Sequence, residues 1–206
     1  DKMGVGKVFV NVFKDRAQRL ALFLSGGLML GHFVIIPFIN PYMEFNVGFT
    51  KAQTPMIYMA GGSCALLSST VIGRLADKFG KFRIFTICLL LSLVPIFIIT
   101  DMPSINFYLV LGIFGFWFTF TTGRNIPAQA MISTVVQPQE RGRFMSLNSS
   151  FQQLFTGMAS LISGLIVVRD ATGKIHNYNW VGYFSIVVVF SMLFMGAALV
   201  KQQKLK

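Results

Sequence analysis

The sequence predicts an all-α membrane protein, a bundle of six transmembrane helices, and three observations lead to this fold class. Hydrophobic residues make up 54% of the 206-residue chain and charged residues only 12%, whereas about a quarter of a soluble domain is charged. The mean hydropathy is +0.65, and a surface this apolar would aggregate in water. The apolar residues form long runs, with short polar segments between them. We therefore expect lipid to be the solvent for most of the chain.

Six segments are long enough to cross a bilayer, which takes about 20 mostly apolar residues. The predicted spans are residues 20–39, 55–75, 84–100, 106–134, 145–168 and 180–200. A buried helix of a soluble core could explain one such segment, but six in series with short polar joints make that explanation improbable. The chain then divides into a cytoplasmic leader or inter-domain linker (1–19), a transmembrane domain (20–200) and a cytoplasmic tail (201–206).

Local signals mark the ends of these spans. Thr54 followed by Pro55 suits the N-cap and first position of a helix. Residues 101–104, Asp-Met-Pro-Ser, predict a tight turn. Pro138 is expected to end the fourth span, and Trp180 lies where an interfacial aromatic anchor belongs.

The net charge of +11 reflects sidedness in the membrane and requires no nucleic-acid partner. Six spans return the C-terminus to the side of the N-terminus, and fourteen of the 18 basic residues fall on that side. They are Lys2, Lys7, Lys14, Arg16, Arg19, Arg74, Lys78, Lys81, Arg83, Arg141, Arg143, Lys201, Lys204 and Lys206. Because cytoplasmic loops collect Lys and Arg, we expect both termini in the cytoplasm, with the protein in a bacterial inner membrane.

Pairs of small residues predict close helix packing. Gly27 and Gly31 form a GxxxG pair, and Gly61 with Ala65 and Ser160 with Gly164 are looser versions of it. Small residues at this spacing let two helix backbones approach each other in lipid.

The segment GRLADKFGKFR, residues 73–83, places five charged side chains between two apolar runs. It resembles the signature loop of the major facilitator superfamily, Gly-x-Leu-Ala-Asp-(Arg/Lys)-x-Gly-(Arg/Lys), and lies between the second and third spans, as in that family. Phe82 stands where a second basic residue is usual, and Arg83 follows it. Residues 137–167 are also similar to the corresponding loop and helix of drug and sugar efflux members. The matching positions are Gly73, Leu75, Ala76, Asp77, Lys78, Gly80 and Lys81.

The resemblance implies a fold of twelve helices in two six-helix halves, with substrate bound between them. This chain would supply one half, and its basic leader and trailing KQQKLK favour the C-terminal one. The implied function is secondary active transport of a small molecule by alternating access, in the direction of efflux. Its partners would be the other half, membrane lipid and the substrate. A six-span homodimeric transporter or a non-transporting sensor is the alternative.

In such a transporter the signature loop acts as a conformational latch. We expect Asp77 to accept hydrogen bonds from basic residues of the loop or from the amides at a helix N-terminus, and Gly73 to let a neighbouring helix pass close by. A merely solvated turn is the alternative. The expected latch residues are Gly73, Asp77, Lys78, Gly80, Lys81 and Arg83.

Polar residues within the spans are the candidates for a substrate cavity, because charged groups in a bilayer are costly and tend to mark function. Arg124 either faces the cavity or extends to the lipid headgroups. His32 either contacts substrate or bonds a neighbouring helix. The candidate residues are His32, Arg124, Asn125, Gln129, Asn148 and Gln152.

The sequence offers little for enzyme chemistry. It has two histidines and two cysteines, with no metal-binding or nucleophile–base motif among them. We expect no cofactor, no metal and no catalytic residue, and we expect Cys64 and Cys88 to be buried without forming a disulfide.

Overall fold

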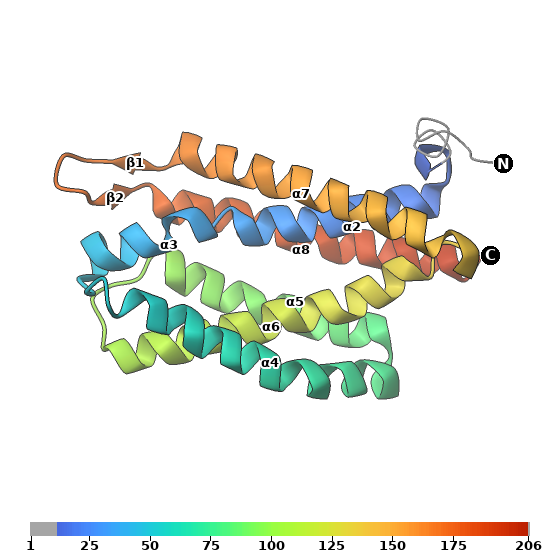
Figure 1. Ribbon diagram of the computed structural model, residues 1–206, viewed down its shortest axis with the longest axis horizontal. Coiled ribbons are helices and arrows are strands. Elements are labelled where there is room, and N and C mark those ends of the chain that lie inside the picture. Colours follow the sequence, from blue (N-terminus) through green and yellow to red (C-terminus); the bar gives the residue numbers. More distant parts are fainter. Residues whose placement is uncertain (1–11, 206) are drawn as a thin grey trace.

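The computed structural model describes residues 12–205, so residues 1–11 of the predicted leader and Lys206 lie outside the described residues. All six predicted spans form helices, and the first of them is broken (Figure 1). The helical elements are α2 (Arg16–Phe33), α3 (Ile36–Tyr42), the π-helical turn η1 (Met43–Val47), α4 (Thr54–Phe79), α5 (Lys81–Thr100), α6 (Phe107–Ser133), the 3-10 turn η2 (Pro138–Glu140), α7 (Arg141–Ile166) and α8 (Tyr178–Gln203).

A short antiparallel hairpin interrupts the all-helical pattern. Strand β1 (Val168–Arg169) pairs with β2 (Ile175–His176) between α7 and α8. The side chain of Asn46 in η1 bonds both backbone groups of Ile175, each at 2.8 Å, and thus ties the hairpin to the first span.

The helices differ in how apolar they are. Among the described residues, four helical stretches are long and apolar enough to cross a membrane: Arg16–Val47, Thr54–Phe79, Lys81–Thr100 and Tyr178–Gln203. Helices α6 and α7 are comparable in length, with 27 and 26 residues, and carry polar side chains in their middle parts, among them Arg124 and Asn148. Polar side chains within a bundle are tolerated where they face protein or a cavity, so these two helices are the first places to look for a site.

The six helices pack as two groups of three. Helix α2 packs against α7 and α8, helix α6 packs against α4 and α5, and the groups meet where α5 contacts α8 and α2 contacts α6 (Figure 1). The two groups are equivalent in their contacts if α2 corresponds to α6, α4 to α7 and α5 to α8. The contact of α2 with α7 then corresponds to that of α6 with α4, and the contact of α2 with α8 to that of α6 with α5. Such a pattern is typical of the inverted repeats within transporter halves, although no repeat is visible in the sequence.

The first span is broken at Val34 and Ile35 because Pro37 has no N–H to continue the helix. The Ile35 amide turns to the carbonyl of His32, at 3.4 Å. Hydroxyl groups of α8 then satisfy two carbonyls of the break. Ser185 donates to Gly31, and Tyr178 donates to Ile35 at 2.9 Å.

The GxxxG prediction for Gly27 and Gly31 is confirmed as a close contact of α2 with α8. A Cβ atom at Gly31 would lie 2.5 Å from Cγ2 of Val189, and one at Gly27 would overlap Met192. Gly61 is similarly close to Phe118 of α6, at 2.5 Å.

The prediction for Ser160 and Gly164 is wrong within this chain. Both residues are exposed, and a Cβ atom at Gly164 would meet nothing within 4 Å. The outward orientation of this face of α7 explains the difference. Cys64 also differs from expectation, because it is exposed, whereas Cys88 is buried as predicted; neither forms a disulfide.

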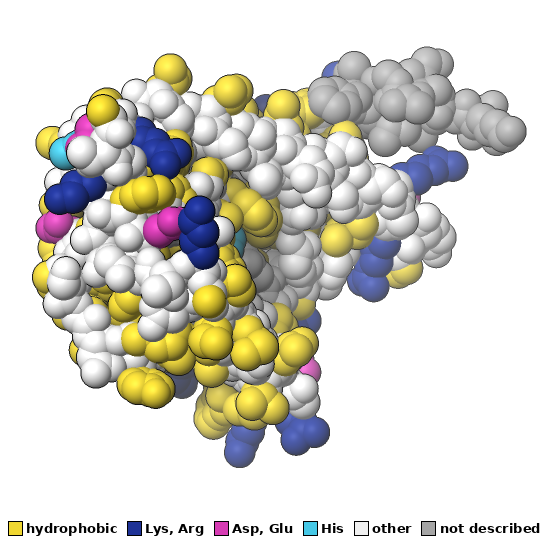
Figure 2. Space-filling model, turned by 60° about the vertical axis from the view of Figure 1, so that its left-hand side comes forward, with side chains coloured by type: hydrophobic (Ala, Val, Ile, Leu, Met, Phe, Trp, Pro, Cys, Tyr) yellow, Lys and Arg dark blue, Asp and Glu magenta, His cyan; other side chains and the backbone are white. Residues whose placement is uncertain are grey.

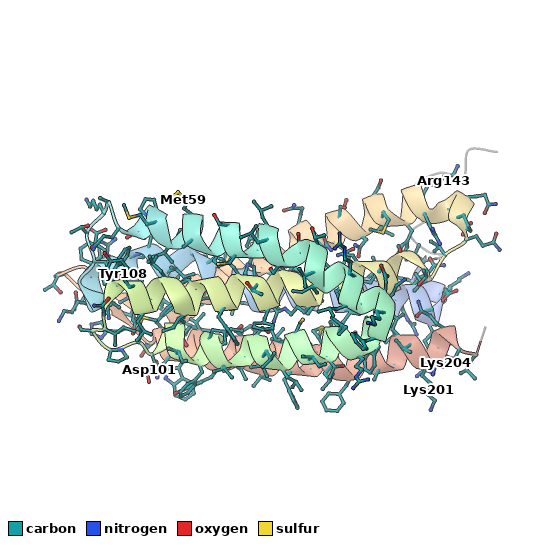
Figure 3. The ribbon with its side chains drawn as sticks, turned by 90° about the horizontal axis from the view of Figure 1, so that it is seen from below. Met59, Asp101, Tyr108, Arg143, Lys201 and Lys204 are labelled. Carbon is teal, nitrogen blue, oxygen red and sulfur yellow. The ribbon has the colours of Figure 1, made fainter. Side chains whose placement is uncertain are left out.

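The two ends of the bundle differ in charge. Figure 3 shows Arg143, Lys201 and Lys204 at one end and Asp101 at the opposite end. We call the first the basic end, and the loop that joins α4 to α5 also lies there. Figure 2 brings the opposite end forward, where small groups of basic and acidic side chains lie among hydrophobic ones. One such group at that end is Glu44 with Lys51, at 3.9 Å.

Candidate functional site

The signature loop is a tight connection between two antiparallel helices. Helix α4 ends at Phe79, and α5 begins at Lys81. Gly80 connects them with φ +97 and ψ 132, a conformation that residues with a side chain rarely adopt. Its amide bonds the carbonyl of Ala76 at 3.1 Å, which closes the end of α4. Gly80 therefore has a structural reason to be a glycine.

The charged groups of the loop are not paired with one another in the described part of the chain. Asp77, Arg74 and Arg83 are exposed, and the ion pairs found within residues 12–205 do not include Asp77. Lys78 lies over the ring of Phe79, 5.3 Å from its centroid. Asp77 thus finds no partner in its own loop, contrary to one of our expectations.

The space next to Gly73 is open as well. A Cβ atom there would meet nothing within 4 Å. No described helix uses the close approach that this glycine permits, so its predicted role stays a prediction.

The interior of the bundle contains a polar layer between two hydrophobic clusters. One cluster includes Ile96, Trp117 and Val181, and the other, toward the basic end, includes Leu89, Ala128 and Val189. On α5, α6, α7 and α8, buried polar residues lie along the sequence between members of the two clusters. We define the polar layer as these residues together with Ser25, which bonds to one of them: Ser25, Ser92, Thr121, Arg124, Asn148 and Ser185.

Arg124 lies in this layer with 0% of its surface exposed. Its Nη1 donates to the hydroxyl of Ser92 in α5 at 2.8 Å, while its Nε and Nη2 have no hydrogen-bond partner among the described residues. The sequence analysis expected Arg124 either to extend to the headgroups or to face a cavity. In this structure its side chain does neither and lies inside the bundle. The reason is its position seven residues after Trp117 and four before Ala128, on the face of α6 that packs into the core.

Asn148 is likewise inside the bundle, with 1% of its surface exposed. Its side-chain oxygen accepts a short hydrogen bond from the Ser25 hydroxyl, which joins α7 to α2. Gln152 lies one turn further along α7 and is partly exposed, with a buried Nε2 that lacks a partner. Asn148 therefore links α7 to α2 through a hydrogen bond, whereas Gln152 lies nearer to the surface.

His32 contacts α6 through its ring. The ring lies 4.9 Å from that of Trp117 and 5.2 Å from that of Phe33, measured between centroids. Its buried Nδ1 has no hydrogen-bond partner among the described residues. We expected His32 to form a hydrogen bond with a neighbouring helix, but Nδ1 forms none among the described residues. The ring contacts α6 through aromatic packing on Trp117 instead.

Asn125 and Gln129 are one turn apart on α6, and both are partly exposed. His32 and Gln152 share this partial exposure. These four candidates remain accessible from outside this bundle, whereas Arg124 and Asn148 are buried within it. The sequence analysis missed Ser92 and Trp117, since a lone serine and an aromatic residue within apolar runs give no signal of a polar layer.

The exposed faces of the helices differ in chemistry. On α5, every exposed residue between Ile87 and Phe97 is apolar. On α7, the exposed face includes several small or polar residues, namely Ser146, Ser149, Ser150, Gln153, Gly157, Ser160 and Gly164. Helix α4 also exposes polar residues, namely Ser63, Cys64 and Thr70. The exposed face of α5 suits lipid, whereas α4 and α7 mix these small or polar residues with exposed large apolar ones such as Leu66 and Leu165, a mixture that suits contact with another protein surface.

Known proteins resemble this chain over most of its length. A multidrug resistance protein, MdtG, of Yersinia enterocolitica is 26% identical over 200 residues, which are 92% of this chain and 45% of the relative. A multi-drug resistance efflux pump PmrA homolog of Lactococcus lactis is 32% identical over 113 residues, 52% of this chain and 26% of the relative. An uncharacterized MFS-type transporter, YbcL, of Bacillus subtilis is 22% identical over 177 residues, 86% of this chain and 44% of the relative.

The chain thus spans less than half the length of these relatives. The sequence model of the Major Facilitator Superfamily matches residues 21–205, which include all the helices except the first turn of α2. The chain belongs to the Major Facilitator Superfamily and is an integral membrane protein.

Proposed function

We propose that this chain is one six-helix half of a secondary transporter, and that the whole protein exports small molecules by alternating access. Relatives named for multidrug resistance and efflux support this function. Their greater length supports the assignment to one half, because the chain accounts for 45% of the Yersinia protein.

The observation that carries the proposal is the chemistry of the exposed helix faces. A free-standing bundle in lipid would be expected to have apolar residues around its whole circumference. Helices α4 and α7 instead expose Ser, Thr, Gln and Gly residues among large apolar ones such as Leu66 and Leu165. These two helices would form the face that meets the other half, while α5 and α8 face lipid.

The substrate would bind between the halves, next to side chains that remain partly exposed. His32, Asn125, Gln129 and Gln152 meet this condition. Amide side chains can both donate and accept hydrogen bonds, and the rings around His32 offer apolar contact. Such a mixture suits small organic molecules with few polar groups.

The latch would close across the two halves. Asp77 is exposed and has no ion pair within the described chain, and the space beside Gly73 is open. A helix end of the other half could therefore offer amides to the Asp77 carboxylate, with Lys78, Lys81 and Arg83 close by. A contact formed in only one conformation favours that conformation by its own free energy.

The charge distribution supports an orientation with both termini in the cytoplasm of a bacterial cell. The described basic residues concentrate at the end of the bundle that contains the signature loop (Figure 3). Positive loops remain on the cytoplasmic side during insertion. The relatives named above are bacterial, which suits the inner membrane.

The test compares two proteins in liposomes loaded with a fluorescent cationic dye. One is the full-length transporter, and the other is the 206-residue chain alone. We expect the full-length protein to move the dye across the membrane when a proton gradient is imposed. We expect the chain alone to move no dye under the same conditions. Transport by the chain alone would contradict the assignment to one half and favour a homodimeric transporter. No transport of any drug-like compound by the full-length protein would favour a sensor.

A further inference from the structure

We propose that the polar layer holds a small anion of about the size of chloride, bound by Arg124 inside this half and separate from the path of the substrate. A guanidinium group stays charged in proteins, and buried charges are normally paired. Arg124 is 0% exposed, so its charge needs a partner within the bundle.

No acidic side chain of the described residues supplies that partner. The acidic residues of this part of the chain are at helix ends or in connections, far from the middle of the spans. They are Asp15, Glu44, Asp77, Asp101, Glu140 and Asp170. The polar layer therefore carries a positive charge without compensation from these residues.

Several hydrogen-bond donors in the layer lack an acceptor. Nε and Nη2 of Arg124 have no partner among the described residues, and neither does the hydroxyl of Thr121. Thr121 is 4% exposed and lies three residues before Arg124 on the same face of α6. Helical side chains lean toward the N-terminus of their helix, and Thr121 lies on that side of Arg124. Both groups can therefore reach one ligand.

The Asn148 oxygen and the Ser92 hydroxyl, two acceptors of the layer, already accept hydrogen bonds. The Asn148 oxygen accepts from Ser25, and the Ser92 hydroxyl accepts from Nη1 of Arg124 and donates to the carbonyl of Leu89. The hydroxyl of Ser185 donates to the carbonyl of Gly31. A surplus of donors together with a positive charge is complementary to an anion.

The neighbourhood of Arg124 favours a small ion. The preceding residue, Gly123, packs so closely that a Cβ atom would lie 2.7 Å from Ile72 and 2.9 Å from Cys88. Because the backbone next to Arg124 is packed this tightly, we propose an ion as small as chloride and not a polyatomic organic anion. Because Arg124 is already buried within this half, the ion would not be carried with the substrate.

The test measures thermal unfolding of the full-length protein in detergent while chloride replaces gluconate at constant ionic strength. We expect a saturable rise of the unfolding midpoint with chloride, since a ligand stabilises the state that binds it, and bromide should act in the same way. The variant Arg124→Gln should show no response, whereas the exposed Arg143→Gln should respond like the wild type.

Thr121→Val is the second variant, because valine has nearly the shape of threonine without its hydroxyl. Loss of one hydrogen bond should raise the apparent dissociation constant for chloride by up to about tenfold. This variant decides the question if Arg124→Gln does not fold. The proposal is wrong if the wild-type midpoint is the same in chloride and gluconate, or if Arg124→Gln or Thr121→Val responds to chloride like the wild type. The readout requires no transport, so it is independent of the proposed function.

Discussion

Replacing Gly31 by alanine should weaken the packing of α2 against α8. The added Cβ atom would lie 2.5 Å from Cγ2 of Val189 and 3.5 Å from the carbonyl oxygen of Ser185. Carbon atoms in contact are normally about 3.5–4.0 Å apart, so the two helices must separate by roughly 1 Å. Val189 is 0% exposed and has little freedom to move away.

The change in the free energy of unfolding follows from two destabilising effects and one stabilising effect. Overpacking of a tight interior costs about 1–3 kcal/mol. Separation of the helices also weakens the hydrogen bond from the Ser185 hydroxyl to the Gly31 carbonyl, a bond of a type worth about 0.5–1.5 kcal/mol. Alanine in place of glycine favours the helix by about 1 kcal/mol. We therefore expect a net loss of about 1–3 kcal/mol in the free energy of unfolding.

The assay is unfolding of the purified protein in detergent, with Gly112→Ala as the matched control. Gly112 is exposed in α6, and a Cβ atom there would meet nothing within 4 Å. This control should be stabilised by up to about 1 kcal/mol, through helix propensity alone.

A double variant tests the specific contact. Val189→Ala removes the atom that Gly31→Ala would strike, so the combined change should cost less than the sum of the two single changes. Equal effects of Gly31→Ala and Gly112→Ala would refute the reasoning, and so would strict additivity with Val189→Ala.

Three further predictions concern other parts of the molecule. Tyr178→Phe removes the 2.9 Å hydrogen bond to the broken first span and should lower the free energy of unfolding by about 0.5–1.5 kcal/mol; an unchanged unfolding curve would contradict this. Asp77→Asn should reduce transport and leave unfolding in detergent unchanged, because Asp77 is exposed and has no ion pair in the described chain; transport at the wild-type rate would count against the latch. Hydrogen bonds from Thr172 and then His176 hold the pKa of the Asp170 carboxyl well below its usual range. The contribution of this carboxylate to hairpin stability is therefore complete above its unfolded pKa of about 3.9, and it is lost as the pH falls through the lower folded pKa. Proteolysis of the hairpin should consequently rise only under strong acid. Asp170→Asn should remove that pH dependence.

Much of this protein follows from local properties of the sequence. Length and hydropathy of the apolar runs predicted the six helices, because crossing a membrane requires about 20 apolar residues whatever their neighbours are. Gly80 lies in the signature loop, where the backbone adopts a positive φ that glycine tolerates. The break at Pro37 was not predicted, because prolines also occur inside continuous helices, as Pro95 and Pro127 do. The signature loop predicted the family, which the match over residues 21–205 shows.

The orientation of each helix about its own axis was decided by the tertiary structure. Apolar residues surround α5, α6 and α8 almost evenly, so the sequence gives little sign of which face packs inward. Gly27 and Gly31 meet α8, whereas Ser160 and Gly164, at the same spacing, face outward. In lipid, both faces of a helix contact apolar surroundings, and only packing against particular partners distinguishes them.

Arg124 illustrates the same division. The sequence alone determined that a charged residue lies within the fourth span, and the physics of the bilayer made it a functional candidate. Only the tertiary structure decided that it turns toward Ser92 and the centre of the bundle and is 0% exposed. The reason is that burial depends on α4, α5 and α2 packing against α6, and the positions of these helices are set by the fold.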